Sequence, residues 1–459
     1  MKRRGIKVAK FGGTSLADAN QIRKVCAIVK ADPARRIIVV SAPGKRTRED
    51  TKVTDLLIAL ARARLSGQSG EAERDAVLSR YEAIIRDLGL PEALLREIAD
   101  DLDRRLAADT KEGGAYTDLL KAAGEDYCAR LVAMALTREG VTARYVGPKE
   151  AGLVLSDEPG NAQVLPESYE NLSRALGNAR DVVVFPGFFG LTPAGRVVTF
   201  PRGGSDITGA ILAAAIRADE YENFTDVDSV FAADPRLVPE ARPIELLTYR
   251  EMRELAYAGF GVFHDEAIIP AVHARIPIRI RNTNRPDAPG TRVVPERPYT
   301  AGAVVGIASS EGFCTLYVDK YLMNREVGFG RRLLQIIEEE GLAYEHMPSG
   351  IDNLSLVLRE DRLTEAMKAR ILERCRTELK ADDAEFEPGL SLIMIVGEGM
   401  RYTVGMAARA TSALAHAGVN IEMMNQGASE ISMMFGVKSV DRKRAVRALY
   451  DEFFPAGSC

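Results

Sequence analysis

An internal repeat in the C-terminal third of the chain constrains the fold more than any other feature. Seven residues of one segment recur in the next at a single offset, 405 − 328 = 77 positions. The pairs are Val327/Val404, Gly328/Gly405, Gly341/Gly418, Glu345/Glu422, Met347/Met424, Gly350/Gly427 and Ser355/Ser432. Each copy has the pattern of a strand, a helix that starts at glycine, two further strands and a second helix. Fixed spacing over about 30 residues implies two copies of one small α+β module.

Strand and helix patterns alternate in the chain before the repeat. Short β-branched runs at 6–10, 37–41 and 181–186 predict strands, and helical patterns follow at 15–30 and 206–218. Alternation of this kind predicts an α/β domain whose largely parallel sheet is covered by helices on both faces. A segment at about 55–109, rich in Ala, Leu, Arg, Asp and Glu, predicts an insert of amphipathic helices. We interpret its charged residues as a solvated face.

These patterns divide the chain into four parts. We expect an α/β domain over 1–290, a linker over 291–302, and the two modules over 303–380 and 386–459. Four prolines and two glycines between 285 and 302 predict the extended linker. Duplicated modules after a linker serve more often as ligand sensors or dimerisation units than as catalytic parts.

Composition and charge exclude several classes of protein. The 459 residues include 61 Lys and Arg against 65 Asp and Glu, a net charge of −4, which does not favour nucleic-acid or membrane partners. No apolar run approaches the roughly 18 residues of a membrane helix, and residues 1–4 are not followed by the apolar core of a secretory signal. The five scattered cysteines form no Cys-x-x-Cys pair, so we expect reduced thiols in a cytoplasmic protein.

A glycine pair at 12–13 lies between a predicted strand and a predicted helix, directly after Lys10. Two glycines let backbone N–H groups approach an anion, the helix N-terminus adds positive potential, and Lys10 adds a full charge. The pattern is not a Walker A loop, in which the lysine follows the glycines. Alone, a glycine pair here more often marks only a tight strand–helix connection.

A second glycine pair opens the helix predicted at 206–218. Arg202, Ser205 and Asp206 flank it, a set suited to holding a carboxylate beside a metal–phosphate group. A simple capped helix start is the alternative. A third segment, 225–236, places short acidic and hydroxyl side chains after a strand, where ligands bind in open α/β sheets, although an Asp-rich turn is more often structural. Two glycine turns in one domain favour a phosphate site.

Taken together, these motifs resemble the aspartate kinase (aspartokinase) family over essentially the whole chain. The resemblance rests on Lys-Phe-Gly-Gly-Thr-Ser at 10–15, Gly-Phe-Phe-Gly at 187–190, Arg-Gly-Gly-Ser-Asp at 202–206, Thr-Asp-Val-Asp at 225–228, Asp-Pro-Arg at 234–236, and two ACT-like repeats. It implies a three-layer amino-acid-kinase domain followed by two ferredoxin-like ACT domains. It also implies ATP-dependent phosphorylation of the β-carboxylate of L-aspartate to 4-phospho-L-aspartate. That reaction is the first step of lysine, threonine, methionine and diaminopimelate biosynthesis.

The resemblance also assigns site residues. The implied catalytic residues are Lys10 and Asp206. The implied substrate-binding residues are Thr54, Glu125, Phe188, Arg202 and Ser205. The implied ATP-binding residues are Lys10, Gly12, Gly13, Thr225, Asp226, Phe231, Arg236 and Gly261. The chain departs from the family at two of these, because Phe231 replaces a frequent Tyr and Gly261 replaces a frequent nucleotide-contacting Lys.

Regulation and partners follow from the same resemblance. ATP is the expected cosubstrate, and Mg²⁺ is expected to be carried mainly by the nucleotide, without a metal site of the protein's own. Lysine, threonine or both are the expected effectors, and we expect a homodimer or higher homo-oligomer formed through the ACT domains. The implied effector-binding residues are Gly328, Phe329, Ala343, Tyr344, Glu345 and Ser349.

The chemistry of the residues agrees with this reaction. An aspartate carboxylate, with an ordinary pKa near about 4, is already ionised at pH 7, so the transfer needs positioning and charge neutralisation and no general base. The four histidines fall in no ligand spacing, and we interpret them as structural or surface residues. Two alternatives remain: a kinase for another carboxylate or phosphate acceptor on the same fold, and a non-catalytic amino-acid sensor.

Overall fold

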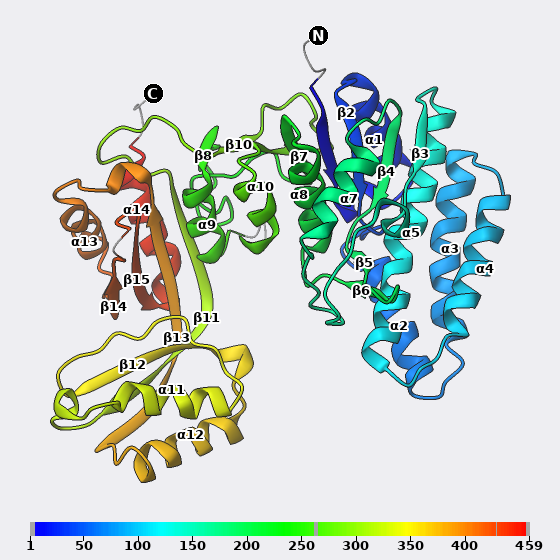
Figure 1. Cartoon of the computed structure of the whole chain (residues 1–459). Coiled ribbons are helices and arrows are strands. Elements are labelled where there is room, and N and C mark those ends of the chain that lie inside the picture. The colour runs from blue at the N-terminus through cyan, green and yellow to red at the C-terminus, as the bar shows by residue number, and fades with distance from the viewer. Residues whose placement is uncertain (1–4, 261–264, 428, 456–459) are drawn as a thin grey trace. The chain divides into compact units, whose positions relative to one another are not determined.

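The computed structural model describes residues 5–260, 265–427 and 429–455. The chain divides into two compact units, which are described separately (Figure 1). The first takes in Met1–Val230, Pro243–Tyr249 and Gly261–Arg297, and the second takes in Phe231–Arg242, Arg250–Phe260 and Pro298–Cys459. Two short segments from the middle of the chain therefore belong to the unit that contains the repeat.

The first unit is built on an eight-stranded sheet. Its strands follow the order β3 (Ala143–Tyr145), β4 (Val182–Pro186), β2 (Arg35–Val40), β1 (Lys7–Phe11), β7 (Glu220–Thr225), β9 (Ile278–Asn282), β10 (Thr291–Val294) and β8 (Leu246–Thr248). All neighbours are parallel except β9 and β10. The predicted largely parallel sheet is confirmed, and the strands expected at 6–10, 37–41 and 181–186 correspond to β1, β2 and β4.

Side-chain alternation on β1 shows how both faces of the sheet are used. Ala9 and Phe11 join a core formed with α1 (Ala19–Ala31) and α5 (Gly113–Arg138). Successive side chains of a strand point to opposite faces, so Val8 and Lys10 point the other way. Helix α8 (Gly204–Ile216) packs across β1, β2 and β7, with α7 (Glu167–Leu176) and α10 (Ile269–His273) beside it. The expected three-layer α/β domain is confirmed.

The helical insert consists of α2 (Val53–Leu65), α3 (Glu71–Leu88) and α4 (Ala93–Leu106). Its apolar residues, among them Tyr81 and Leu102, join the same core as α1 and α5. The interpretation of its charges as a solvated face is wrong for part of the insert. Arg80 is only 5% exposed, and Arg105 bridges Asp101 and Asp126 at 2.7 and 3.0 Å. Arg80 is buried and Arg105 half-buried because hydrogen-bond acceptors inside the unit surround their guanidinium groups.

Shorter elements complete the first unit. They are η1 (Gly13–Leu16), α6 (Pro148–Ala151), η2 (Asp265–Ile268) and the antiparallel pair β5 (Phe189–Leu191) and β6 (Val197–Thr199). Helix α9 (Tyr249–Tyr257) follows β8, and from Arg250 onward it belongs to the second unit. Thr291–Val294 lies in the segment expected to be a linker, yet it forms β10 and pairs with β8 and β9. Its β-branched residues satisfy their backbone groups in the sheet ladder.

The second unit contains a five-stranded antiparallel sheet. Its strands follow the order β12 (Asn353–Arg359), β11 (Gly306–Asp319), β13 (Asp383–Val396), β15 (Ser432–Lys438) and β14 (Met423–Asn425). Its helices are α11 (Phe329–Glu339), α12 (Glu365–Thr377), α13 (Met406–His416) and α14 (Arg442–Phe453), with short turns η3 (Met323–Arg325), η4 (Glu360–Arg362), η5 (Glu398–Met400) and η6 (Ser439–Asp441).

The repeat found in the sequence is visible in this unit. Helices α11 and α13 begin 406 − 329 = 77 residues apart, and each follows a glycine in the left-handed conformation, Gly328 at φ 80° and Gly405 at φ 90°. Glycine adopts this conformation without the penalty that a Cβ would bring. The conserved offset therefore marks the start of the first helix in each copy.

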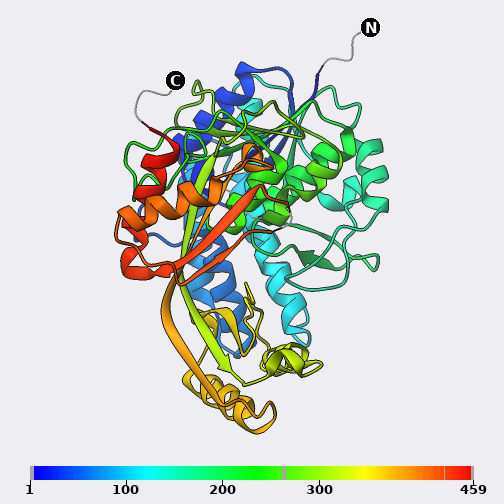
Figure 2. The same cartoon turned by 90° about the vertical axis from the view of Figure 1, so that its left-hand side faces the viewer.

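The two long strands β11 and β13 run side by side and serve both copies (Figure 1, Figure 2). Gly306–Ser310 pairs with Leu392–Val396, and 313–319 pairs with 383–390. The register shifts between these halves, where β11 has Gly312 at φ 87° and β13 has Pro388, which cannot donate a ladder hydrogen bond. The sheet of each copy is thus completed by half of a strand from the other.

Two sequence expectations concern whole-chain properties. Cys26, Cys128, Cys314 and Cys375 are free and buried, and the last two lie in the core of the first copy. Among the described residues, no helix is long and apolar enough to cross a membrane.

Candidate active site

Functional side chains gather where parallel strands of the first unit end. Loops leave the carboxyl ends of β1, β2, β4 and β7 at Gly12, Ser41, Gly187 and Asp226. These strands are neighbours in the sheet, so the four loops share one edge. Ligands of open α/β sheets bind in the crevice at this edge.

Lys10, Asp206 and Asn223 form a buried polar cluster at this edge. The Lys10 Nζ lies 2.6 Å from Asp206 Oδ1, and the Asn223 amide donates to the same oxygen at 2.6 Å. The parallel register of β1 and β7 pairs Lys10 directly with Asn223, while Asp206 comes from the first turn of α8. Lys10 is only 7% exposed. The cluster therefore presents one oriented ammonium group beside the glycine turn.

The glycine turn after Lys10 packs against the loop after β2 at very short range. The Gly44 N–H donates to the Gly13 carbonyl at 2.8 Å. A Cβ on Gly44 would lie 2.5 Å from the Gly13 carbonyl carbon, closer than real Cβ atoms approach. Next to it, a Cβ on Gly12 would lie 3.6 Å from the Lys10 Nζ. Both loops need glycine because their backbones touch.

The second glycine pair fixes Phe188 in an unusual conformation. Phe188 has φ 76°, a left-handed value that costs a bulky residue free energy, and its N–H donates to Thr208 Oγ1 at 3.0 Å. A Cβ on Gly204 would lie 2.5 Å from the Phe188 ring, and a Cβ on Gly187 would lie 2.7 Å from Ser205. Strain held by surrounding contacts is typical of functional sites.

Glu125 is a buried carboxyl group on α5. Its side chain is nearly inaccessible, and its Oε2 has no hydrogen-bond partner among the residues that the structure describes. Burial raises its pKa to about 8, against the lowering effects of a backbone hydrogen bond from Ala42 and the charge of Lys121. An orphaned, nearly inaccessible carboxylate oxygen fits a cationic ligand group.

The other predicted site residues are placed as follows. Thr54 is half-buried in the first turn of α2, and Arg202 is exposed just before α8. Thr225 ends β7 and donates to Asp226 at 3.2 Å. Phe231 and Arg236 lie in the second unit, where Arg236 pairs with Asp234 at 2.8 Å.

One predicted residue, Gly261, lies outside the described residues. Among the described residues, no group of three or more His, Cys, Asp or Glu side chains is placed to hold a metal ion.

Sequence reasoning missed Asn223 and Lys121. Asn223 is a lone amide in the buried strand β7, a signal that would have indicated a polar partner at the strand's end. Lys121 lies one helical turn before Glu125, its ammonium contacts Asp118 at 2.9 Å, and it sits 5.4 Å from the centre of the Phe188 ring. The i, i+4 spacing of Lys121 and Glu125 on one helix could have linked them.

The expected effector residues lie in the first copy of the repeat. Gly328 and Phe329 begin α11, whereas Ala343 and Tyr344 are exposed and Ser349 forms an isolated bridge to Leu354. The Glu345 carboxylate accepts a hydrogen bond from the Tyr257 hydroxyl at 2.7 Å, within the same unit. The carboxylate that the resemblance assigns to the effector is therefore half-exposed and oriented.

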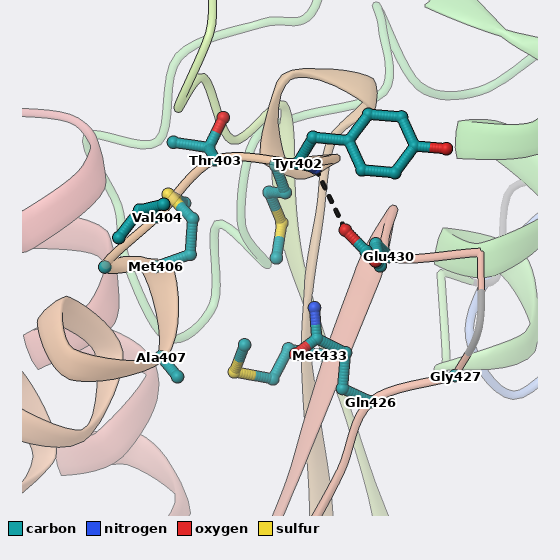
Figure 3. Close-up of a pocket in the computed structure, with 11 residues that line it drawn as sticks. Tyr402, Thr403, Val404, Met406, Ala407, Gln426, Gly427, Glu430 and Met433 are labelled. Carbon is teal, nitrogen blue, oxygen red and sulfur yellow. Dashed lines mark hydrogen bonds between the residues drawn. The ribbon is translucent and has the colours of Figure 1, made fainter.

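The second copy contains a cavity of about 710 Å³ at the equivalent place (Figure 3). It lies between the start of α13 and the turn before β15, and the Tyr402 N–H donates to Glu430 at 3.0 Å across its rim. Its lining includes Gly405, Met406 and Gln426, which the offset of 77 equates with Gly328, Phe329 and Ser349.

Comparison with known proteins places these observations in a family. The model of the amino acid kinase family matches residues 5–282, and that of the ACT domain matches 393–453. Aspartokinase 3 of Bacillus subtilis is 55% identical over 449 residues, which cover 98% of this chain and 99% of the relative.

Solved structures give the same picture. The chain is 36% identical to aspartate kinase from Clostridium acetobutylicum, with a TM-score of 0.85 and coverage of 98% and 100% of the two chains. Escherichia coli aspartokinase III is 27% identical in two structures. Its complex with aspartate and ADP has a TM-score of 0.77 and coverage of 98% and 100%. Its complex with lysine and aspartate has a TM-score of 0.78 and coverage of 98% and 99%. The kinase-domain match, the regulatory-domain match and the full-length relative agree, and the chain belongs to the aspartokinase family.

Proposed function

We propose that the polar cluster of Lys10, Asp206 and Asn223 is the centre at which this aspartokinase transfers the γ-phosphoryl group of ATP to the β-carboxylate of L-aspartate. The product is 4-phospho-L-aspartate. One observation carries the assignment: the buried Lys10 ammonium is held by Asp206 at 2.6 Å next to a glycine turn, at the ligand-binding edge of the sheet. Such an arrangement neutralises charge on a transferring phosphoryl group.

In this proposal, the phosphates of the nucleotide bind at the glycine turn. The Gly13 N–H faces the phosphates, while the Gly12 N–H is donated to the Phe224 carbonyl at 3.1 Å and Gly12 leaves space beside the Lys10 ammonium because it has no side chain. Lys10 supplies the charge that matters most in the transition state. Asp206 orients Lys10 through their ion pair. Thr225, Asp226, Phe231, Arg236 and Gly261 are the further nucleotide contacts by family resemblance. Mg²⁺ enters with ATP and supplies additional neutralisation of the phosphate charge.

The amino-acid substrate requires both signs of charge. The orphaned, buried Glu125 accepts its ammonium group, and Arg202, which is exposed beside the second glycine pair, forks onto its α-carboxylate. Thr54, Phe188 and Ser205 complete the pocket. The β-carboxylate is ionised at pH 7 and attacks without a general base.

An ADP-release assay with alternative acceptors tests the function. The purified chain with MgATP should release ADP with L-aspartate and not with L-glutamate or UMP. Preference for glutamate or UMP would indicate a kinase for another acceptor. Absence of turnover with all three acceptors, while an amino acid binds in calorimetry, would indicate a sensor.

The second unit adds amino-acid regulation. In our proposal, lysine, alone or together with threonine, binds the first copy of the repeat at Gly328, Phe329, Ala343, Tyr344, Glu345 and Ser349, and copies of the chain associate through their ACT domains. An effector inhibits only when it binds an inactive state more tightly than the active one. Glu345 would hold the extra ammonium of lysine.

Glu345→Ala should therefore weaken inhibition by lysine. The loss of the carboxylate removes the only acid assigned to the effector side chain, so the lysine concentration for half-inhibition should rise about tenfold or more. Initial rates measured against lysine, with and without threonine, give this value.

The repeat supplies a matched control for this variant. Glu422, at 345 + 77, is the equivalent residue in the second copy and is exposed. Glu422→Ala should leave the lysine curve in place. An unmoved curve in Glu345→Ala would remove lysine from this position.

A further inference from the structure

Arg80 on α3 is a buried arginine outside the proposed binding residues. Its Nη1 donates to the carbonyls of Gly44 at 3.0 Å and Ala17 at 3.3 Å. Its Nη2 donates to Asp50 Oδ2 at 2.6 Å and to the Thr51 carbonyl at 2.8 Å. With only 5% of the residue exposed, the guanidinium is enclosed by its acceptors. One side chain from the helical insert thus donates hydrogen bonds to three backbone carbonyls and one carboxylate.

These four acceptors belong to two different loops. Ala17 ends the turn that begins with the glycine pair after Lys10, which we call the phosphate loop (12–17). Gly44, Asp50 and Thr51 belong to the loop between β2 and α2, which we call the acceptor loop (41–52) because Thr54 follows it. The loops also contact each other directly, where Gly13 lies against Ala42 and Gly44.

The acceptor loop has little other anchorage in its middle. Residues 45–49 are exposed. The Asp50 Oδ2 accepts hydrogen bonds from the Arg46 Nε at 2.9 Å and from the Arg80 Nη2 at 2.6 Å. Arg46 lies in the same loop, so it closes the loop on itself without fixing it to the domain. Among the described contacts, Arg80 of helix α3 ties this stretch to the domain, through its ion pair with Asp50 and its bonds to the Gly44 and Thr51 carbonyls at either end.

We infer that Arg80 is a positioning residue that holds the phosphate loop and the acceptor loop in register, so that ATP and the amino-acid substrate meet in line. This inference rests on the proposed function. Arg80 itself does not touch either substrate in this scheme. Loss of the clamp misplaces both loops together, which distinguishes it from loss of a group that acts on one substrate.

Lysine cannot replace the arginine in this role. The planar guanidinium directs several N–H groups at fixed angles, whereas an ammonium is a single compact charge on a flexible stem. Arg80→Lys retains the positive charge opposite Asp50 and loses the simultaneous bonds to Ala17, Gly44 and Thr51. A misplacement of about 1 Å in a reacting pair costs about 100-fold in rate.

The test compares Arg80→Lys with Arg105→Lys in the full chain. Arg105 is a half-buried arginine of the insert that bridges Asp101 and Asp126, and its described contacts include neither loop. In Arg80→Lys, KM for ATP and KM for aspartate should both rise and kcat should fall, with kcat/KM lower by about 100-fold. Arg105→Lys should lower only the thermal unfolding temperature.

Chemical rescue separates positioning from general support of the fold. In Arg80→Gly, added guanidinium ion at millimolar concentration should restore part of kcat/KM, and methylammonium ion should not. Unchanged KM values and kcat in a folded Arg80→Lys protein would overturn the inference. Inactivity of the wild-type chain with aspartate would instead overturn the proposed function.

Asp50→Asn provides a second variant in case Arg80→Lys does not fold. It removes the ion pair and leaves the three carbonyl bonds of Arg80 in place. Both KM values should rise together in this variant. Kinetic constants equal to those of the wild type would overturn the clamp.

Discussion

Lys10→Ala is expected to lower kcat about 10²–10³-fold, the range found when one preorganised stabilising group is removed from a transition state. The KM for aspartate should change little, because the Lys10 charge acts where negative charge moves during the transfer. Steady-state rates of ADP release at saturating ATP and aspartate measure both constants. Circular dichroism and thermal unfolding establish that the variant is folded.

The same strand supplies a matched control. Lys7 also lies on β1 and pairs with Asp32 at 3.0 Å and Glu220 at 3.5 Å, but it is at the opposite end of the strand from the glycine turn. Lys7→Ala removes an ion-paired ammonium from the same strand, away from the glycine turn, and should keep kcat within about twofold of the wild type. Near-normal turnover in a folded Lys10→Ala protein would mean that the loop is only a structural turn.

Local patterns were sufficient to predict the architecture. The β-branched runs of β1, β2 and β4 differ from the observed strands by one or two residues at their ends, since period and composition act within a few neighbours. The offset of 77 predicted the start of α11 and α13 because a left-handed glycine before a helix is a backbone requirement that one residue can satisfy.

Long-range pairing could not be predicted in this way. The sharing of β11 and β13 between the two copies depends on contacts between residues more than 60 positions apart, and nothing local marks the partner. The segment Thr291–Val294 similarly became a strand because β8 and β9 offered free ladder groups beside it. Arg80 was assigned to a solvated face since helical charge patterns do not reveal acceptors contributed by distant loops.

The polar cluster was predicted in part. Lys10 and Asp206 each follow from a glycine turn at the start of a helix, but their 2.6 Å contact needs the register that places α8 across β1. Asn223 enters the cluster through the pairing of β1 with β7. Glu125 had only the family resemblance behind it, because an acid within a helix is most often exposed.

Glu125→Gln is expected to have the second large effect, on binding of the amino acid. On the proposed assignment, Glu125 pairs with the substrate ammonium in a buried place, and loss of one partner of such a pair costs about 2–5 kcal/mol, or about 30-fold or more in kcat/KM for aspartate. The KM for ATP should change little. Glu139→Gln, at the exposed end of the same helix, is the matched control and should behave as wild type.

The raised pKa of Glu125 gives this assignment a pH signature. Without substrate, burial holds the pKa at about 8, so most molecules carry a proton on Glu125 at pH 7. The ammonium of aspartate binds the ionised form, so binding must release a proton, and KM for aspartate should fall as the pH rises from about 6 to about 8.

Whereas aspartate binding should strengthen as the pH rises, the stability of the substrate-free protein should decrease. Between about pH 4.5 and about pH 8, the folded chain binds a proton on Glu125 that the unfolded chain does not. The contribution of Glu125 to the free energy of unfolding therefore decreases as the pH rises through this window. Glu125→Gln removes this pH dependence. The unfolding temperature of the variant minus that of the wild type should therefore be more positive at pH 8 than at pH 5.

Calorimetric titration of aspartate in two buffers of different ionisation enthalpy measures the protons released. The wild type should release a substantial fraction of one proton per aspartate bound at pH 7, because Glu125 passes from mostly protonated to ionised. Glu125→Gln should release none, and Glu139→Gln should match the wild type. Binding without proton release in the wild type, or unchanged aspartate affinity in Glu125→Gln, would place the substrate ammonium elsewhere in the first unit.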